Sequence, residues 1–199
     1  VLWYQGESNY LTPEQYADQF AALCAQYRTL FSDEDLPVVY AQLPQYAIDD
    51  WKDFRLMQWN LMQSVGDVYA VCGIDLGEAY NIHPADKAVF AERAAGVAAR
   101  YVYGIETAPG LSAYPVSLVR EGDTIVITYN NAESGLQGTD ITGFEVAGAD
   151  GLFTPAAAQI VGNQVVLSEI PQNVTQVRYL YGSSFGAVGL YTGNGLPAA

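Results

Sequence analysis

Polar residues gather at two points in the first half of the chain. Residues 5–9, Gln-Gly-Glu-Ser-Asn, follow the apolar residues 1–4, and residues 75–87 contain His83, the only histidine among the 199 residues. Histidine titrates near neutrality and therefore suits a general base. A neighbouring carboxylate can fix its tautomer and stabilise its charged form. The two segments thus offer a candidate base together with candidate carboxylates and amides.

Both segments are expected at the same edge of a parallel β-sheet. Apolar runs that predict strands alternate with stretches of helical periodicity, in the order β-α-β-α-β-α. The strands are expected at residues 1–4, 38–43 and 68–74, and the helices at residues 12–30, 51–62 and 84–103. This order is typical of a doubly wound α/β sheet, in which ligands bind at the carboxyl ends of the strands. Each polar segment follows a strand and is therefore expected there.

The helices carry regular apolar stripes. In the first helix Thr12 is the expected N-cap, followed by Pro13, and Gln15 completes a capping box. The buried stripe is expected to contain Tyr16, Phe20, Leu23, Tyr27 and Leu30, and the inward residues of the third helix are expected to be Val89, Phe90, Ala94, Val97 and Tyr101. Lys87 lies in the first turn of that third helix, where the helix dipole disfavours a cation. We therefore expect a specific partner for Lys87, such as the carboxylate of Asp75.

A different pattern begins at residues 107–110, Thr-Ala-Pro-Gly. Beyond it the helical period is lost, and short apolar runs separated by hairpin-type turns predict a small β-sandwich. The strands are expected at residues 116–119, 124–129, 143–146, 158–161, 165–167 and 176–180. The sequence therefore predicts two domains, an α/β domain over residues 1–108 and a β-sandwich module over residues 109–199.

The composition excludes several classes of protein. Eight basic and 22 acidic residues give a formal net charge of −14, which disfavours binding to nucleic acid. No apolar stretch is long enough to span a membrane, so membrane insertion is not expected. The two cysteines, Cys24 and Cys72, lie in apolar stretches and are expected to be buried free thiols. No metal site or other cofactor is expected.

Several linked motifs occur in order along the chain. They are Trp-Tyr-Gln-Gly-Glu-Ser-Asn at residues 3–9, Gln-Leu-Pro at 42–44, Trp51 with Arg55 and Gln58, Asp-Leu-Gly-Glu at 75–78, Ile-His-Pro at 82–84, Lys87 and Arg93, and the closing residues 177–179 and 189–197. Together they resemble the sialate O-acetylesterase family, whose members are SGNH-type hydrolases related to the acetylxylan esterases of carbohydrate esterase family 6. The resemblance implies a serine esterase that removes acetyl groups from sugar hydroxyls.

The resemblance also implies roles for individual residues. His83 would be the general base that takes the proton from a nucleophilic serine. Glu7 matches the glutamate of a related Gln-Gly-Glu motif and is the first choice for the carboxylate that orients His83, with Asp75 as the second choice. Gln5 and Asn9 are amides that can donate to the developing oxyanion or to a sugar hydroxyl.

Two features depart from the family pattern. The family's nucleophile lies in a Gly-Gln-Ser-Asn type motif that is absent here, so the serine is expected upstream of Val1, in an enzyme of which this chain is the carboxyl-terminal part. Ser8 is the alternative nucleophile within the chain. Tyr80 occupies the position, three residues before His83, where SGNH enzymes commonly place an aspartate. A catalytic dyad is therefore an alternative to a triad.

Two functions from different classes follow. The first is an O-acetylesterase that acts on an acetylated sugar or glycan in a periplasmic or secreted setting, completed by an N-terminal segment or by a second chain. The second is a noncatalytic carbohydrate-binding or structural fragment with a degenerate α/β part. A Gly-x-Ser-Asn motif before Val1 would favour the enzyme.

Overall fold

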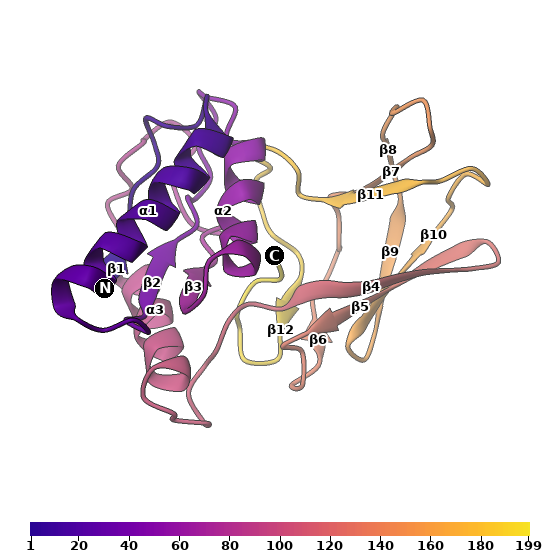
Figure 1. The fold of residues 1–199 in the computed structure, drawn as a ribbon. Helices are drawn as coiled ribbons and strands as arrows, with labels where there is room; N and C mark the ends of the chain where they lie inside the picture. The colour runs from indigo at the N-terminus through magenta and orange to yellow at the C-terminus, as the bar shows by residue number, and fades with distance from the viewer. The chain divides into compact units, whose positions relative to one another are not determined.

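The computed structural model describes all residues from Val1 to Ala199, and these form two units. The first unit contains residues 1–111 together with residues 182–184, and the second contains residues 112–181 and 185–199. In Figure 1 the first unit is coloured mainly from indigo to magenta and the second from pink through orange to yellow. A short stretch from late in the sequence therefore belongs to the unit that the first half of the chain builds.

The first unit is a parallel three-stranded sheet covered by helices. Its strands are β1 (Leu2–Trp3), β2 (Val38–Ala41) and β3 (Val68–Val71), in the order β1-β2-β3, and its helices are α1 (Pro13–Phe31), α2 (Lys52–Ser64) and α3 (Ala88–Tyr101). The side chain of Tyr40 packs on Phe20 of α1, whereas that of Val39 packs in a cluster with Ala94 of α3. Because successive strand residues point to opposite faces, α3 covers one face of the sheet and α1 the other.

The helix starts and stripes depart from prediction in four places. Thr12 is the N-cap of α1, but its side chain makes no capping hydrogen bond, so the predicted capping box is wrong. The stripe of α1 runs through Tyr16, Phe20 and Cys24, and Leu30 is 73% exposed because the last turn extends beyond the core. The third helix begins at Ala88 rather than at residue 84, because the Asp86 carboxylate accepts a hydrogen bond from the Ala88 N–H at 2.8 Å. On that helix, Val89 is exposed rather than inward.

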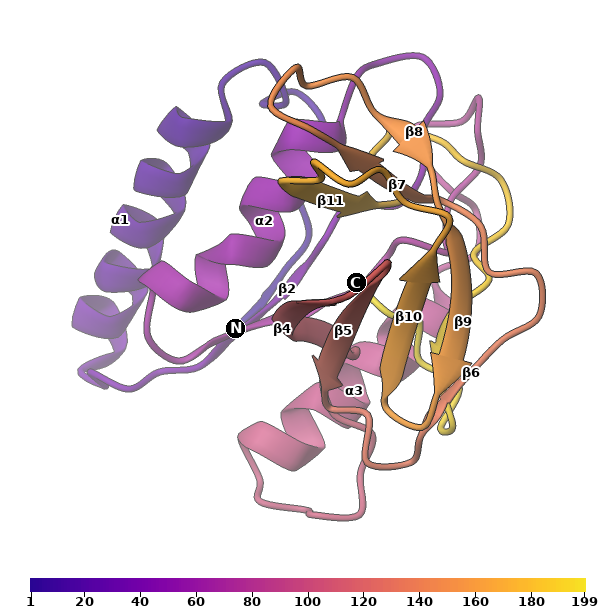
Figure 2. The ribbon, with the colours of Figure 1, turned by 90° about the vertical axis from the view of Figure 1, so that its right-hand side faces the viewer.

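The second unit consists of antiparallel β-structure. Its four-stranded sheet contains, in spatial order, β4 (Tyr114–Glu121), β5 (Thr124–Asn130), β10 (Gln164–Ser168) and β9 (Ala157–Val161). A three-stranded sheet contains β11 (Gln176–Tyr179), β7 (Phe144–Ala147) and β8 (Thr154–Pro155), and β12 (Tyr191–Thr192) pairs with β6 (Leu136–Gln137). Figure 2 shows β5, β10 and β9 side by side.

Alternation along the strands builds the core of the second unit. Ile125 and Ile127 of β5, together with Val165 and Leu167 of β10, are buried, while the residues between them are partly exposed. This is the pattern of a sheet with one face on a core. The six predicted strands all form, and with the parallel sheet of the first unit they confirm the predicted fold class. The strands β6, β8 and β12 were not predicted, because two residues are too few to show a period.

The cysteines bear out a further expectation. Cys24 and Cys72 are both buried and free, as predicted. Burial raises the pKa of the Cys72 thiol to about 11, so it stays protonated at neutral pH. The three helices are each too short or too polar to cross a membrane.

Candidate active site

The two polar segments lie at the same edge of the parallel sheet, as their positions after β1 and β3 require. Lys87, at the end of the second segment, contacts Tyr4, the residue just before the first. Its Nζ donates a hydrogen bond to the Tyr4 hydroxyl at 3.2 Å and lies 4.4 Å from the centre of the Tyr4 ring. The predicted partner of Lys87, the Asp75 carboxylate, is therefore wrong. The helix dipole disfavours the charge of Lys87 at the start of α3, and the cation–π contact with Tyr4 stabilises that charge.

The segment after β1 holds two of the predicted amides together. Gln5 Nε2 donates to Asn9 Oδ1 at 2.7 Å. The backbone carbonyl of Gln5 accepts hydrogen bonds from the Tyr16 hydroxyl at 3.1 Å and from Gln58 Nε2 at 3.3 Å. Gly6 follows with a φ of +147°, and a Cβ at this position would lie 2.5 Å from a ring atom of Phe54. Side chains of α1 and α2 thus hold the loop from the interior of the unit.

Gln58 of α2 is buried under two loops at once. Its Oε1 accepts a hydrogen bond from the Leu43 N–H at 2.9 Å, and its Nε2 donates to the Ala41 carbonyl at 3.2 Å in addition to the Gln5 carbonyl. The exposed fraction of Gln58 is 1%. One amide therefore satisfies backbone groups at the ends of both β1 and β2, which explains the presence of a polar side chain in the core.

Asp75, the second choice for orienting His83, is held by an arginine of α3. Arg93 donates two hydrogen bonds to the Asp75 carboxylate, at 2.6 and 2.7 Å, and a third to the Cys72 carbonyl at 3.0 Å. The Asp75 and Arg93 side chains are 11% and 10% exposed. This paired, charge-assisted contact fastens the end of β3 to α3. Asp75 makes no hydrogen bond to His83.

His83 lies in an exposed turn that a neighbouring carboxylate holds in shape. The Glu78 carboxylate accepts hydrogen bonds from the Ala85 N–H at 2.9 Å and from Asn81 Nδ2 at 3.2 Å, and Asn81 Oδ1 in turn accepts the His83 N–H at 3.0 Å. These bonds lower the pKa of Glu78, the Ala85 bond most. Glu78 thereby braces the turn on both sides of His83. The sequence showed Glu78 close to His83 but not this contact.

The structure brings some of the predicted site residues together and not others. Gln5 and Asn9 are bonded to each other, whereas no hydrogen bond or ion pair joins Glu7 to His83. Glu7 is half-buried and close enough to Tyr16 for its charge to contribute to the raised pKa of that hydroxyl, which is due mainly to burial. Ser8 is exposed. Orientation of His83 by Glu7 therefore stays a prediction.

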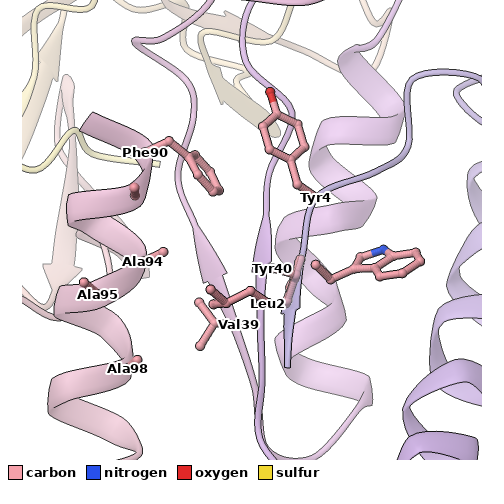
Figure 3. Close-up of a pocket in the computed structure, with 10 residues that line it drawn as sticks. Leu2, Tyr4, Val39, Tyr40, Phe90, Ala94, Ala95 and Ala98 are labelled. Atoms are coloured by element: carbon pink, nitrogen blue, oxygen red, sulfur yellow. The ribbon is translucent and has the colours of Figure 1, made fainter. Parts of the chain in front are cut away.

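A groove of about 280 Å³ lies between α3 and the edge of the sheet. Phe90, Ala94, Ala95 and Ala98 of α3 face Leu2, Tyr4 and Val39 across it (Figure 3). Its lining is apolar, and Leu2 beside it is 73% exposed. The strand β1 is one of the two edge strands of the sheet and pairs with β2 on one side only.

Comparison with known proteins finds a match over the part of the chain that contains both polar segments. A family model described as "Carbohydrate esterase, sialic acid-specific acetylesterase" matches residues 1–99. Residues 1–99 belong to this carbohydrate esterase family. These matched residues include both polar segments and His83, and they end before the second unit begins.

A solved structure resembles the whole chain. It is described as XAC1771, a novel carbohydrate acetylesterase from Xanthomonas citri, with a TM-score of 0.91 and 29% sequence identity over 100% of this chain and 48% of that chain. This chain therefore spans about half the length of that carbohydrate acetylesterase. Curated proteins gave no match.

Proposed function

We propose that this chain is part of an esterase that hydrolyses acetyl esters on sugar hydroxyls, with His83 as the general base. The observation that carries the proposal is the family match over residues 1–99, which contain both segments that the sheet brings to one edge. The substrate is an acetylated sialic acid or another acetylated glycan, and such a substrate favours a periplasmic or secreted setting. No cofactor takes part.

The reaction is an acyl transfer in two steps. His83 takes the proton of a serine hydroxyl while the serine oxygen attacks the acetyl carbonyl, and the protonated imidazole then gives that proton to the departing sugar oxygen. In the second step His83 activates a water molecule, which releases acetate and restores the serine. Asn9 Nδ2, which the bond from Gln5 to Asn9 Oδ1 leaves available, donates to the oxyanion or to a sugar hydroxyl.

The serine lies upstream of Val1 in this proposal, or else on a second chain. A further parallel strand beside β1 would end at the same sheet edge, next to the Gln5–Asn9 pair. The open edge of β1 and the apolar groove beside α3 offer such a strand and its helix a place to pack. The similar carbohydrate acetylesterase is about twice as long as this chain, which is consistent with an esterase that needs further segments.

Glu7 is the proposed carboxylate partner of His83. Asp75 is less suitable because both of its oxygens accept hydrogen bonds from Arg93. Tyr80 replaces the aspartate of the common SGNH pattern and is 82% exposed, so it supplies no carboxylate. If Glu7 does not orient His83, a serine–histidine dyad is the remaining arrangement.

The test compares hydrolysis of p-nitrophenyl acetate and of an acetylated sugar by this chain and by the protein extended upstream. We expect activity from the extended protein and none from residues 1–199 alone. His83→Ala in the extended protein should lower kcat about 10²–10⁴-fold, since it removes the general base.

Other outcomes point elsewhere. Activity of residues 1–199 alone that disappears in Ser8→Ala would make Ser8 the nucleophile. A folded extended protein with no hydrolysis of either ester would overturn the esterase proposal and favour the noncatalytic carbohydrate-binding or structural fragment.

A further inference from the structure

Residues 182–184 belong to the first unit, although they follow strand β11 of the second unit. They bind the loop that follows β2 and the start of α2. The Gly182 carbonyl accepts a hydrogen bond from Arg55 at 3.2 Å. Ser183 Oγ accepts the N–H of Trp51 at 2.7 Å and donates to Asp50 Oδ1 at 3.2 Å. Trp51 is the N-cap residue of α2 and offers no capping side chain of its own. Ser183 therefore supplies a hydroxyl at the start of that helix, where backbone N–H groups need acceptors.

The same three residues hold the loop that follows β2. The Ser183 carbonyl accepts the Tyr46 N–H at 2.9 Å, and Ser184 Oγ donates to Gln45 Oε1 at 3.3 Å. Residues 45 and 46 are thus fixed on both backbone and side chain by a stretch that lies more than 130 residues later in the sequence.

That loop in turn is paired with the segment that leads to His83. The Gln45 N–H donates to the Leu76 carbonyl at 3.0 Å, and the Ala47 N–H donates to the Ala79 carbonyl at 2.7 Å. Gly77 packs so closely that a Cβ there would lie 2.6 Å from the Gln45 carbonyl oxygen. The loop after β2 therefore sets the position of residues 76–79.

The last link is Glu78, which lies inside residues 76–79. Its carboxylate holds the turn around His83 through Asn81 and Ala85. An unbroken series of hydrogen bonds and packed backbone thus runs from residues 182–184 through residues 45–47 and 76–79 to the histidine turn.

We propose that residues 182–184 are a positioning segment for His83. They touch no reacting atom, and they act by fixing the loop after β2, against which the histidine turn is built. The catalytic consequence rests on the proposed function, in which His83 is the general base. The positional consequence does not rest on the proposed function, because it concerns only the location of the His83 imidazole.

The first test uses the imidazole NMR signal of the full 199-residue chain. His83 is the only histidine, so a single pair of ring signals reports its environment and its titration. Ser183→Ala and Ser184→Ala should each shift these signals, and the double variant should shift them further. Ser183→Thr keeps the hydroxyl and should restore them. Ser64→Ala is the control, because Ser64 Oγ donates only to Leu61 at the other end of α2.

The second test measures catalysis in the extended protein. Ser183→Ala should lower kcat about tenfold or more with little change in KM, because a small displacement of the base slows proton transfer without removing binding contacts. Ser183→Thr should recover most of the rate, and the pH profile should shift with the NMR titration of His83.

The outcomes separate the two proposals. Unchanged imidazole signals in both single variants and in the double variant, with a lowered Tm, would overturn the positioning role and leave residues 182–184 a purely structural part. If Ser183→Ala does not fold, Ser184→Ala decides, since it removes one bond from an exposed serine. Shifted signals in a protein without esterase activity would support positioning while overturning the proposed function.

Discussion

The two segments that meet at the sheet edge are held in opposite ways. Residues 5–9 are fixed from the interior, by the buried Gln58 amide and by a glycine pressed against Phe54. Residues 81–85, the turn around His83, are fixed from the surface by the exposed Glu78 carboxylate. Changes beneath the first segment should therefore reduce the stability of the whole unit. Changes around the second should alter the histidine turn and leave the unit folded.

The largest expected effect is that of Gln58→Leu. It removes three hydrogen bonds from buried backbone groups, each worth about 1–3 kcal/mol when its partner is left unsatisfied, so we expect a loss of about 4 kcal/mol in the free energy of unfolding. Denaturant unfolding followed by circular dichroism measures it. Gln63→Leu, at an exposed position of the same helix, is the control and should change the stability by less than about 0.5 kcal/mol. Equal effects would remove the contrast between the two segments.

A smaller and local effect is expected at Glu78, and it depends on pH. The folded-state pKa of Glu78 is lower than its ordinary value of 4.5, so the bonds of the carboxylate stabilise the turn above that pH. The stabilisation is lost as the pH falls through the lower folded value. The protection of the Ala85 amide, measured as its exchange rate relative to the intrinsic rate at the same pH, should fall several-fold there. Glu78→Gln should remove most of this acid dependence while global stability is kept.

The control for that prediction is Glu92→Gln, at an exposed position of α3. It should leave the exchange at Ala85 unchanged at every pH. An acid response of Ala85 that persists in Glu78→Gln would show that another group holds the turn.

The smallest effect is expected from Lys87→Met, which breaks the contact between Lys87 and Tyr4, the residues that flank the two segments. Lys87 is exposed, and its bond to the Tyr4 hydroxyl competes with water, so stability should fall by less than about 0.5 kcal/mol. Thermal unfolding against the unchanged protein measures it. A loss of more than about 2 kcal/mol would mean that the segments depend on each other rather than on separate supports.

Sequence reasoning succeeded where a local pattern carries the signal. The period of Tyr16 and Phe20 predicted the buried side of α1, and the alternation in residues 124–129 predicted β5. The polar segments could be assigned to one sheet edge because parallel strands end together. Most motifs behind the resemblance to carbohydrate esterases lie within residues 1–99, which the family model matches, whereas the closing motifs at residues 177–179 and 189–197 lie outside that match.

The rest depends on contacts that no local pattern records. The partner of Lys87 is an aromatic ring at the end of β1, which charge alone did not suggest. The attachment of residues 182–184 joins positions more than 130 residues apart through single serine hydroxyls and backbone groups. Leu30 fits the helical period but lies past the end of the core, and only the packed structure shows where a core ends.

The placement of residues 182–184 also has a consequence for biosynthesis. A ribosome delivers residues 1–111 first, and the rest of the first unit emerges only after residues 112–181 have been translated. At typical rates of about 5–20 residues per second, the nascent α/β unit waits several seconds for its final hydrogen bonds. During that interval the start of α2 lacks the Ser183 hydroxyl, and the histidine turn reaches its final setting only after the residues of β4 to β11 have been translated.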